Sequence, residues 1–475
     1  MKRSCIILIC ATLNIISQAA YAQKKLSVNE MHEDIEYYFD AIKTMHPYPY
    51  AKYSEAQIDS IELQLYKNCS HEMDLFDFNF LLAKTSKYMD GHTGVYSPLY
   101  DLSANEKNDM FPIVRFVDNK IALNNFIIKS INGIPSSTII QELENLISWE
   151  YHPSFREKTM NSFLTPLLYR VFHISLPFVC NIEYSETNRS ICDTIIKSEN
   201  KKEQSRQSKL SKNYDGAILY EYHQNDSIAL LFYNTSDIWG NKILEKAMDN
   251  FTKIFFEQLK EKNIKYLFID VSQNVGGSDN AHKYFFRSLK TKPYKYTQYE
   301  LVTLTGGQKR NEQYCLMEAG CKTIEDLPIN KVKELKKLNL RIEKKIKKLQ
   351  EKGNLKRIRK FKVNKKGFDG NVFVIMGNNT YSAGHDFCEE VKWNKTGLLV
   401  GEESGQRFPY SGNACTDTLP NSGIKYYFAT SYFWTEPALP TQNGFLKPDL
   451  QYNISKPLTI EDYKAIIKLS YKLNY

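Results

Sequence analysis

The sequence lacks the short motifs that mark several common classes of enzyme. It contains no C-x-x-C and no H-E-x-x-H pattern, so we do not expect a zinc site. Neither G-x-x-x-x-G-K nor G-x-G-x-x-G is present, which argues against a phosphate-binding loop. After the N-terminal segment no run reaches about 18 apolar residues, so stable membrane insertion of the mature chain is not expected. We therefore expect a protein that needs neither a metal nor another cofactor.

Cysteine is also sparse, with nine in 475 residues. Cys5 and Cys10 lie in an N-terminal segment that we expect to be removed, and the seven that remain are an odd number. At least one thiol should therefore be free. Cys315 and Cys321 are close enough in sequence to bridge a small loop in an oxidising compartment, but spacing does not reveal which cysteines pair.

The first residues have the pattern of a secretory signal peptide. A positively charged start is followed by an apolar run from Cys5 to Ile16 and by a small-x-small end at Ala20-Tyr21-Ala22. The apolar run is too short to span a bilayer comfortably, although an uncleaved anchor is the alternative. We expect a signal peptide over 1–22, cleavage near Ala22, and a secreted or periplasmic mature chain.

The charge is positive overall and unevenly spread. The formal net charge is +9, and Lys or Arg is frequent between Lys331 and Lys366. Nucleic-acid binding is not expected, because the compartment is wrong and no docking motif is present. Apolar residues at helical spacing, including Leu335, Leu338 and Ile342, favour a solvated amphipathic helix packed against the core. The alternative is a lid or a surface that steers acidic substrates.

The pattern of apolar residues changes twice along the chain. Residues 23–105 read as a helical region, since apolar residues recur at steps of three and four. Residues 106–213 contain short strand-like runs and form a β-rich segment. From 214 to 475, buried-type strands alternate with glycine turns and helices, which predicts an α/β core with a largely parallel sheet. The basic helical insert interrupts this core at about 305–368.

A serine and a glycine pair follow two buried strands of this core. Ser382 comes just after Val372–Met376 and begins a helix, at the carboxyl end of a strand, where open α/β sheets place their sites. Gly276-Gly277 occupies the matching position in the preceding unit, where glycine allows a close backbone approach. The structural alternatives are a helix N-cap for the serine and a tight turn for the glycines. Neither feature alone decides between them.

A serine nucleophile needs a base, and histidine is the commonest one. His92 stands in Asp90-Gly91-His92-Thr93, just after a predicted helix. A lone histidine there is more often an exposed capping residue. The chain has nine histidines, so spacing alone does not select His92.

Taken in order, these motifs resemble those of the tail-specific protease family, which includes the C-terminal processing proteases and the tricorn core. The matching stretches are Asp90-Gly91-His92-Thr93, Ile131-Asn132-Gly133, the run from Asp270 to Gly277, Asn379-Thr380-Tyr381-Ser382-Ala383-Gly384, the run from Leu399 to Gly405, Leu419-Pro420-Asn421-Ser422-Gly423 and Lys447-Pro448-Asp449-Leu450. The resemblance implies a crotonase/ClpP-like spiral core of α/β class, a helical N-terminal region and a small PDZ-like β-rich segment. It also implies an exported serine peptidase that acts on peptides or proteins; oligomeric state stays open.

The resemblance further implies roles for single residues. Ser382 would be the nucleophile, and backbone N–H groups of Ala383 and of Gly276 or Gly277 would hold the oxyanion. Processing proteases use a lysine about 25 residues after the serine, but this chain has Gln406-Arg407 there, and arginine stays protonated. The tricorn-like members use the histidine of the Asp-x-His-Thr motif. His92 is therefore the expected base.

The sequence departs from the family pattern at the third catalytic group, the carboxylate that orients the base. Tricorn-like members have a glutamate where this chain has Gln442, so Glu436 or Glu403 could supply the carboxylate instead. His385 could act as a second base, although a structural role is favoured. Two other functions stay open: a weakened peptide-binding protein on the same scaffold, and an esterase-type hydrolase of small acyl groups.

Overall fold

The structure is a computed structural model of the chain. It describes residues 25–100, 114–123, 126–174, 178–184, 190–195, 218–237, 242–290, 295–352, 356–360, 367–436 and 444–473. The expected signal peptide lies outside these residues. Within them the architecture is mixed α/β, as the sequence predicts, and no described helix has the length and apolar character needed to cross a membrane.

The N-terminal unit is a helical layer. Its first two helices begin with capping boxes, in which Ser27 pairs with Glu30 and Ser54 pairs with Gln57. The apolar side chains of these helices form one buried cluster with residues of a later hairpin. The elements of the unit are β1 (Lys25–Leu26), α2 (Val28–Met45), α3 (Glu55–Asn68), β2 (Met73–Asp74), α4 (Leu75–Ala83), η1 (Lys84–Tyr88), β3 (Gly94–Val95) and η2 (Pro98–Tyr100).

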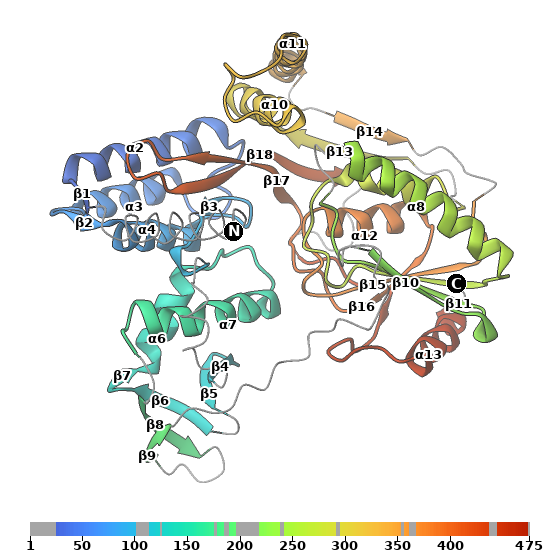
Figure 1. Cartoon of the computed structure of the whole chain (residues 1–475), viewed down its shortest axis with the longest axis horizontal. Helices are drawn as coiled ribbons and strands as arrows, with labels where there is room; N and C mark the ends of the chain where they lie inside the picture. The colour runs from blue at the N-terminus through green and yellow to red at the C-terminus, as the bar shows by residue number, and fades with distance from the viewer. Residues whose placement is uncertain are drawn as a thin grey trace, which may run out of the picture.

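The middle unit pairs a small antiparallel sheet with two helices. Its sheet has the order β4-β5-β6-β8-β9, and β7 pairs with β6. In Figure 1 this unit lies below the helical layer. Its elements are β4 (Val114–Val117), β5 (Lys120–Leu123), β6 (Phe126–Ile131), β7 (Ile134–Pro135), α6 (Ser136–Asn145), α7 (Pro153–Arg170), β8 (Phe178–Tyr184) and β9 (Ser190–Ile195).

The large unit is built on a mostly parallel sheet in the order β10-β11-β12-β15-β16-β19. Its central strands are nearly continuous apolar runs, because helices cover both faces of the sheet. The strands are β10 (Ile218–His223), β11 (Ile228–Tyr233), β12 (Tyr266–Asp270), β15 (Asn371–Met376), β16 (Leu398–Gly401) and β19 (Leu450–Gln451). The covering helices are α8 (Lys242–Glu261), α9 (His282–Phe286), α12 (Ala383–Asn394) and α13 (Ile460–Ser470), with the 3-10 turns η3 (Gln224–Asp226), η4 (Asp279–Ala281) and η5 (Tyr471–Leu473).

A second sheet, in the order β14-β13-β18-β17, joins the large unit to the helical layer. In Figure 1 its long hairpin runs from the α/β unit across to α2. The short strand β3 pairs with β18, so that Val95 lies opposite Tyr426. Because β3 starts two residues after His92, its pairing with β18 holds the loop that contains His92 against the second sheet. The strands are β13 (Lys295–Leu301), β14 (Lys356–Lys360), β17 (Tyr410–Thr418) and β18 (Lys425–Glu436).

The basic insert forms two helices, α10 (Leu304–Ala319) and α11 (Ile329–Lys352), which stand out at the top of Figure 1. The amphipathic helix predicted from the sequence is present as α11. Its apolar face lies on α10 and on a small cluster around Ile342 and Val302, rather than on the main core. The hydroxyl of Thr303 donates a hydrogen bond to the carbonyl of Met45, which ties the insert to the end of α2.

Candidate active site

Ser382 stands on a tight loop between β15 and α12. The hydroxyl of Thr380 donates to the carbonyl of Val271, and the N–H of Tyr381 donates to the carbonyl of Asn274, both at 3.0 Å. These bonds hold the loop at the end of β12. Ser382 itself has φ 49° and ψ −124°, a conformation that costs about 1–3 kcal/mol and is found at functional sites.

The side chain of Ser382 does not cap helix α12. The N-cap alternative raised from the sequence is therefore not how this hydroxyl is used. Its Oγ lies 3.2 Å from Nε2 of His92, although the two residues are 290 positions apart in the chain. The fold thus brings together the two side chains that the sequence nominates as nucleophile and base.

His92 is held through its backbone, its ring and a neighbouring carboxylate. Its N–H donates to Oδ1 of Asp90 at 2.8 Å, and its ring stacks on Tyr381 with centroids 5.2 Å apart. Burial lowers the pKa of His92 to about 4, although the negative Asp90 acts in the opposite direction. The imidazole is therefore neutral near pH 7, with a lone pair available to accept a proton.

The carboxylate of Asp90 is itself fixed by His46. The N–H of Tyr48 donates to Nδ1 of His46 at 3.0 Å, so the ring proton must be on Nε2. That Nε2–H lies 2.7 Å from Oδ2 of Asp90, and both side chains are buried. His46, Asp90 and His92 therefore form one chain of hydrogen bonds. The sequence did not indicate a role for His46, because it follows a different helix, 46 residues before His92.

The glycine pair approaches the nucleophile closely. Gly276 and Gly277 have φ +119° and +130°, which favour glycine, and a Cβ on Gly276 would lie 2.6 Å from Cβ of Ser382. The N–H of Gly276 already donates to Oδ1 of Asn274 at 3.0 Å. Within the described part of the chain, the N–H groups of Gly277 and Ala383 have no acceptor.

Gln406 stands beside Ser382, in the stretch where processing proteases carry their lysine. Its Oε1 accepts the backbone N–H of Ser382 at 2.5 Å, and the side chain is fully buried. An amide has no basic nitrogen, so this residue holds the strained serine without acting as a base. The sequence showed that lysine is missing here but did not show that its replacement contacts the nucleophile.

Of the three candidates for the orienting group, Glu403 is the one whose side chain the structure describes, and the ion pairs of that side chain are with residues other than His92. Glu403 lies 3.4 Å from Nε2 of His152 and 3.7 Å from Nζ of Lys447. Glu436 is the last residue of strand β18, and its backbone is paired with that of Thr297 in β13. Gln442 lies outside the described residues.

Two other carboxylates lie beside His92. One oxygen each of Asp90 and Glu150 and one ring nitrogen of His92 lie within 4.8 Å of one another. Two carboxylates and an imidazole could also hold a metal ion. The sequence gave no signal for Glu150, which lies between α6 and α7 in no motif.

His385 lies in helix α12 and is buried in the core of the large unit. Its Nδ1 lies 3.1 Å from the hydroxyl of Ser404, its Nε2 lies 3.7 Å from Oε1 of Glu389, and the side chain is fully buried. These contacts fit the structural role that the sequence favoured over a second base.

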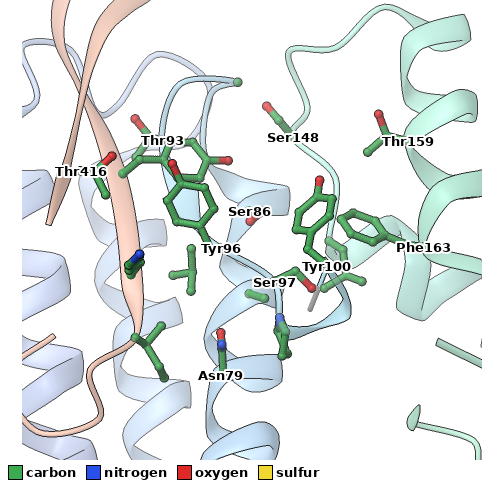
Figure 2. Close-up of a pocket in the computed structure, with 18 of the residues that line it drawn as sticks. Asn79, Ser86, Thr93, Tyr96, Ser97, Tyr100, Ser148, Thr159, Phe163 and Thr416 are labelled. Atoms are coloured by element: carbon green, nitrogen blue, oxygen red, sulfur yellow. The ribbon is translucent and has the colours of Figure 1, made fainter. Parts of the chain in front are cut away.

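A cavity of about 1790 Å³ opens onto the serine and the histidine. It is lined by α4, by residues after β3, by α7 and by β18, and aromatic side chains are frequent in it. Figure 2 shows Tyr96 and Tyr100 in the middle of the cavity, with Phe163 on the side of α7 and Thr416 on the side of the hairpin. A cavity of this size could hold several residues of an extended peptide.

Comparisons with known proteins agree with this picture. The model of peptidase family S41 matches residues 241–451. Three crystal structures of CPAF are similar in fold: a mutant (TM-score 0.57, 13% identity, 94% of this chain and 96% of the other), the mature protein (0.54, 12%, 89% and 92%) and the mature protein complexed with lactacystin (0.52, 12%, 94% and 98%). No curated protein matches the sequence significantly.

The family match covers β12, β15, β16 and β19 of the large sheet, the glycine turn and the serine loop, and the three structures share the fold over most of both chains. Residues 241–451 thus match peptidase family S41, the family of the tail-specific proteases, and the chain is a serine-type peptidase.

Proposed function

We propose that the protein hydrolyses peptide bonds with Ser382 as nucleophile and His92 as general base. The Oγ proton of Ser382 passes to Nε2 of His92 while Oγ attacks the substrate carbonyl carbon. The imidazolium then gives the proton to the leaving amine, and an acyl-enzyme forms. Water repeats the sequence, with His92 again taking and returning one proton, and releases the acid.

The observation that carries this proposal is the 3.2 Å distance between Oγ of Ser382 and Nε2 of His92. It lies at the long end of hydrogen-bond reach, which is common for a catalytic pair without substrate. The lowered pKa of His92, caused by burial, supports the same assignment because it keeps the ring unprotonated near pH 7.

We assign the oxyanion to the backbone N–H groups of Ala383 and Gly277. Ala383 is the first residue of α12, so the positive end of the helix dipole points at the same place. Gly276, the other glycine named from the sequence, contributes its lack of a side chain rather than its N–H, which Asn274 already occupies.

The remaining expectations form part of the same proposal. The substrate is a peptide or protein segment bound in the aromatic cavity, and the mature chain is exported after cleavage near Ala22. Residues 106–213 are a PDZ-like segment, a reading supported by their small antiparallel sheet and two helices. The α/β unit is a crotonase/ClpP-like core, supported by its mostly parallel sheet.

Peptide hydrolysis tests the proposal directly. A mixed peptide library is incubated with wild type, Ser382→Ala and His92→Gln, and new termini are identified by mass spectrometry. We expect cleavage by wild type and a loss of at least about a thousandfold in each variant. Cleavage that persists in Ser382→Ala would rule out the assignment of the nucleophile.

A further inference from the structure

The segment 148–152, between α6 and α7, contacts the loop that carries His92. The hydroxyl of Ser148 donates to the carbonyl of Met89 at 2.7 Å. The N–H of Gly91 donates to Oε2 of Glu150 at 2.6 Å, and the hydroxyl of Tyr151 donates to the carbonyl of Gly91 at 3.5 Å. The backbone of the histidine loop is thus held from the middle unit.

The same segment also contacts the loops around Ser382. The hydroxyl of Tyr381 donates to Oε2 of Glu150 at 3.4 Å. The N–H of His152 donates to the carbonyl of Gly405 at 3.1 Å, one residue before Gln406, whose amide holds the serine. The middle unit therefore bridges the two loops that must meet for catalysis.

Glu150 accepts hydrogen bonds from both loops, and it is only 2% exposed. Burial, together with the negative Asp90, raises the pKa of Glu150 to about 8. Burying a carboxyl group costs folding free energy unless hydrogen bonds compensate for the lost water. A buried carboxyl group with a strongly shifted pKa in a cleft is therefore a candidate functional residue. Nδ1 of the neighbouring His92 is buried without a hydrogen-bond partner among the described residues.

We propose that Glu150 is the positioning residue of the catalytic histidine. Its carboxyl group holds the backbone of Gly91 and the hydroxyl of Tyr381, and so keeps His92 against Ser382. When it is ionised, it joins Asp90 in supplying the negative charge that stabilises the imidazolium. This inference rests on the proposed Ser382–His92 mechanism.

Close packing around Tyr381 explains why glycine is found at position 91. A Cβ on Gly91 would collide with the hydroxyl of Tyr381, so glycine is required where the loop passes this ring. Tyr381 stacks on Phe155 of α7 with centroids 5.5 Å apart, which adds a second contact between the nucleophile loop and the middle unit.

The variant Glu150→Gln tests the charge, because the amide oxygen can still accept the two hydrogen bonds. Its matched control is Glu390→Gln, which neutralises an equally buried glutamate that lies 3.4 Å from another histidine, His282. Above its pKa of about 8, where Glu150 is ionised, we expect Glu150→Gln to lower kcat for peptide cleavage at least about tenfold, below the ~10⁴-fold loss for a triad acid, with KM nearly unchanged. The control variant should keep wild-type kcat.

The pH profile separates positioning from a purely structural role. Ionised Glu150 favours the imidazolium, so the wild-type rate should rise through a limb near pH 8 that Glu150→Gln lacks. The groups that face Glu150 are Asp90 and His92 from the helical layer, Tyr381 and Arg407 from the nucleophile side, Tyr432 from β18 and the adjacent Tyr151. Glu150→Gln leaves all of them in place.

Two outcomes overturn the inference. One is a Glu150→Gln variant with wild-type kcat and a wild-type pH profile. If that variant does not fold, the wild-type pH profile decides instead, because a wild-type rate without the limb near pH 8 would then overturn the inference. Wild-type protein without any peptidase activity would instead contradict the proposed function, so the two failures are distinguishable.

Discussion

At the scale of single residues, the site depends on a glycine whose backbone lies against Ser382 and on the buried imidazole of His92. His92 must be neutral to accept the proton of Ser382, and burial lowers the pKa of its ring to about 4. Peptidase activity should therefore persist well below pH 6.5, the ordinary pKa of histidine, and should fall only as the pH approaches about 4. The dependence of kcat/KM on pH measures this; an acidic limb near pH 6.5 would contradict a buried base.

Gly276 gives a steric test at the same scale. In Gly276→Ala the added Cβ would lie 2.6 Å from Cβ of Ser382 on a backbone with φ +119°. We expect peptidase activity to fall at least about a hundredfold, as when an oxyanion donor is lost. The control is Gly133→Ala, which also has positive φ (+80°) but has no heavy atom within 4 Å of the added Cβ. It should keep its activity, and equal losses in both variants would refute the steric argument.

At the scale of secondary structure, the long hairpin β17–β18 is anchored on α2. Asp34 of α2 is fully buried, and its two carboxylate oxygens accept the N–H groups of Asn421 and Ser422 in the hairpin turn, at 2.9 and 2.8 Å. Since β18 also pairs with β3 beside His92, this anchor helps to fix the histidine loop.

Asp34→Ala should therefore destabilise the protein by about 1.5–3 kcal/mol, because two buried donors lose a charged acceptor. Denaturant unfolding measures the change. Asp40→Ala on the exposed face of the same helix is the control and should stay within about 0.5 kcal/mol of wild type. If both variants were equally stable, the anchor would carry no energetic weight.

The sequence predicts some elements much better than others. Apolar runs such as Ile228–Tyr233 and Asn371–Met376 identify the strands of the large sheet, because buried parallel strands are apolar throughout. The Ser382–His92 pair follows from motif order alone. The hairpin β17–β18 was not predicted as a sheet, because its residues mix aromatic and polar types. Glu150 and His46 could not be found either, since their contacts arise from three units meeting in space.

At the scale of the whole molecule, buried ionisable groups make stability depend on pH. Burial raises the pKa of Glu150 to about 8 and that of Asp386 to about 7. These groups contribute stability that is fully present below their unfolded pKa values, near 4, and is lost as the pH rises to about 7–8. His92 has the opposite sign: its contribution is present above about pH 6.5 and is lost as the pH falls toward 4.

The melting temperature should accordingly be highest in mildly acidic solution and should decrease between about pH 6 and pH 9. Thermal unfolding followed over this range tests the prediction. In Glu150→Gln the alkaline decrease should be smaller, because one of the two raised carboxyl groups is gone. A melting temperature that rises steadily toward pH 9 would contradict the burial of these acids.

The central claim is that three separate units bring one alcohol and one imidazole together as a catalytic pair. Labelling with a fluorophosphonate probe, followed by mass-spectrometric mapping of the adduct, tests it most directly. We predict a single adduct on Ser382 in wild type, no adduct in Ser382→Ala, and labelling at least about a thousandfold slower in His92→Gln. A folded wild-type protein that takes up no probe, or that takes it up on another residue, would contradict the account.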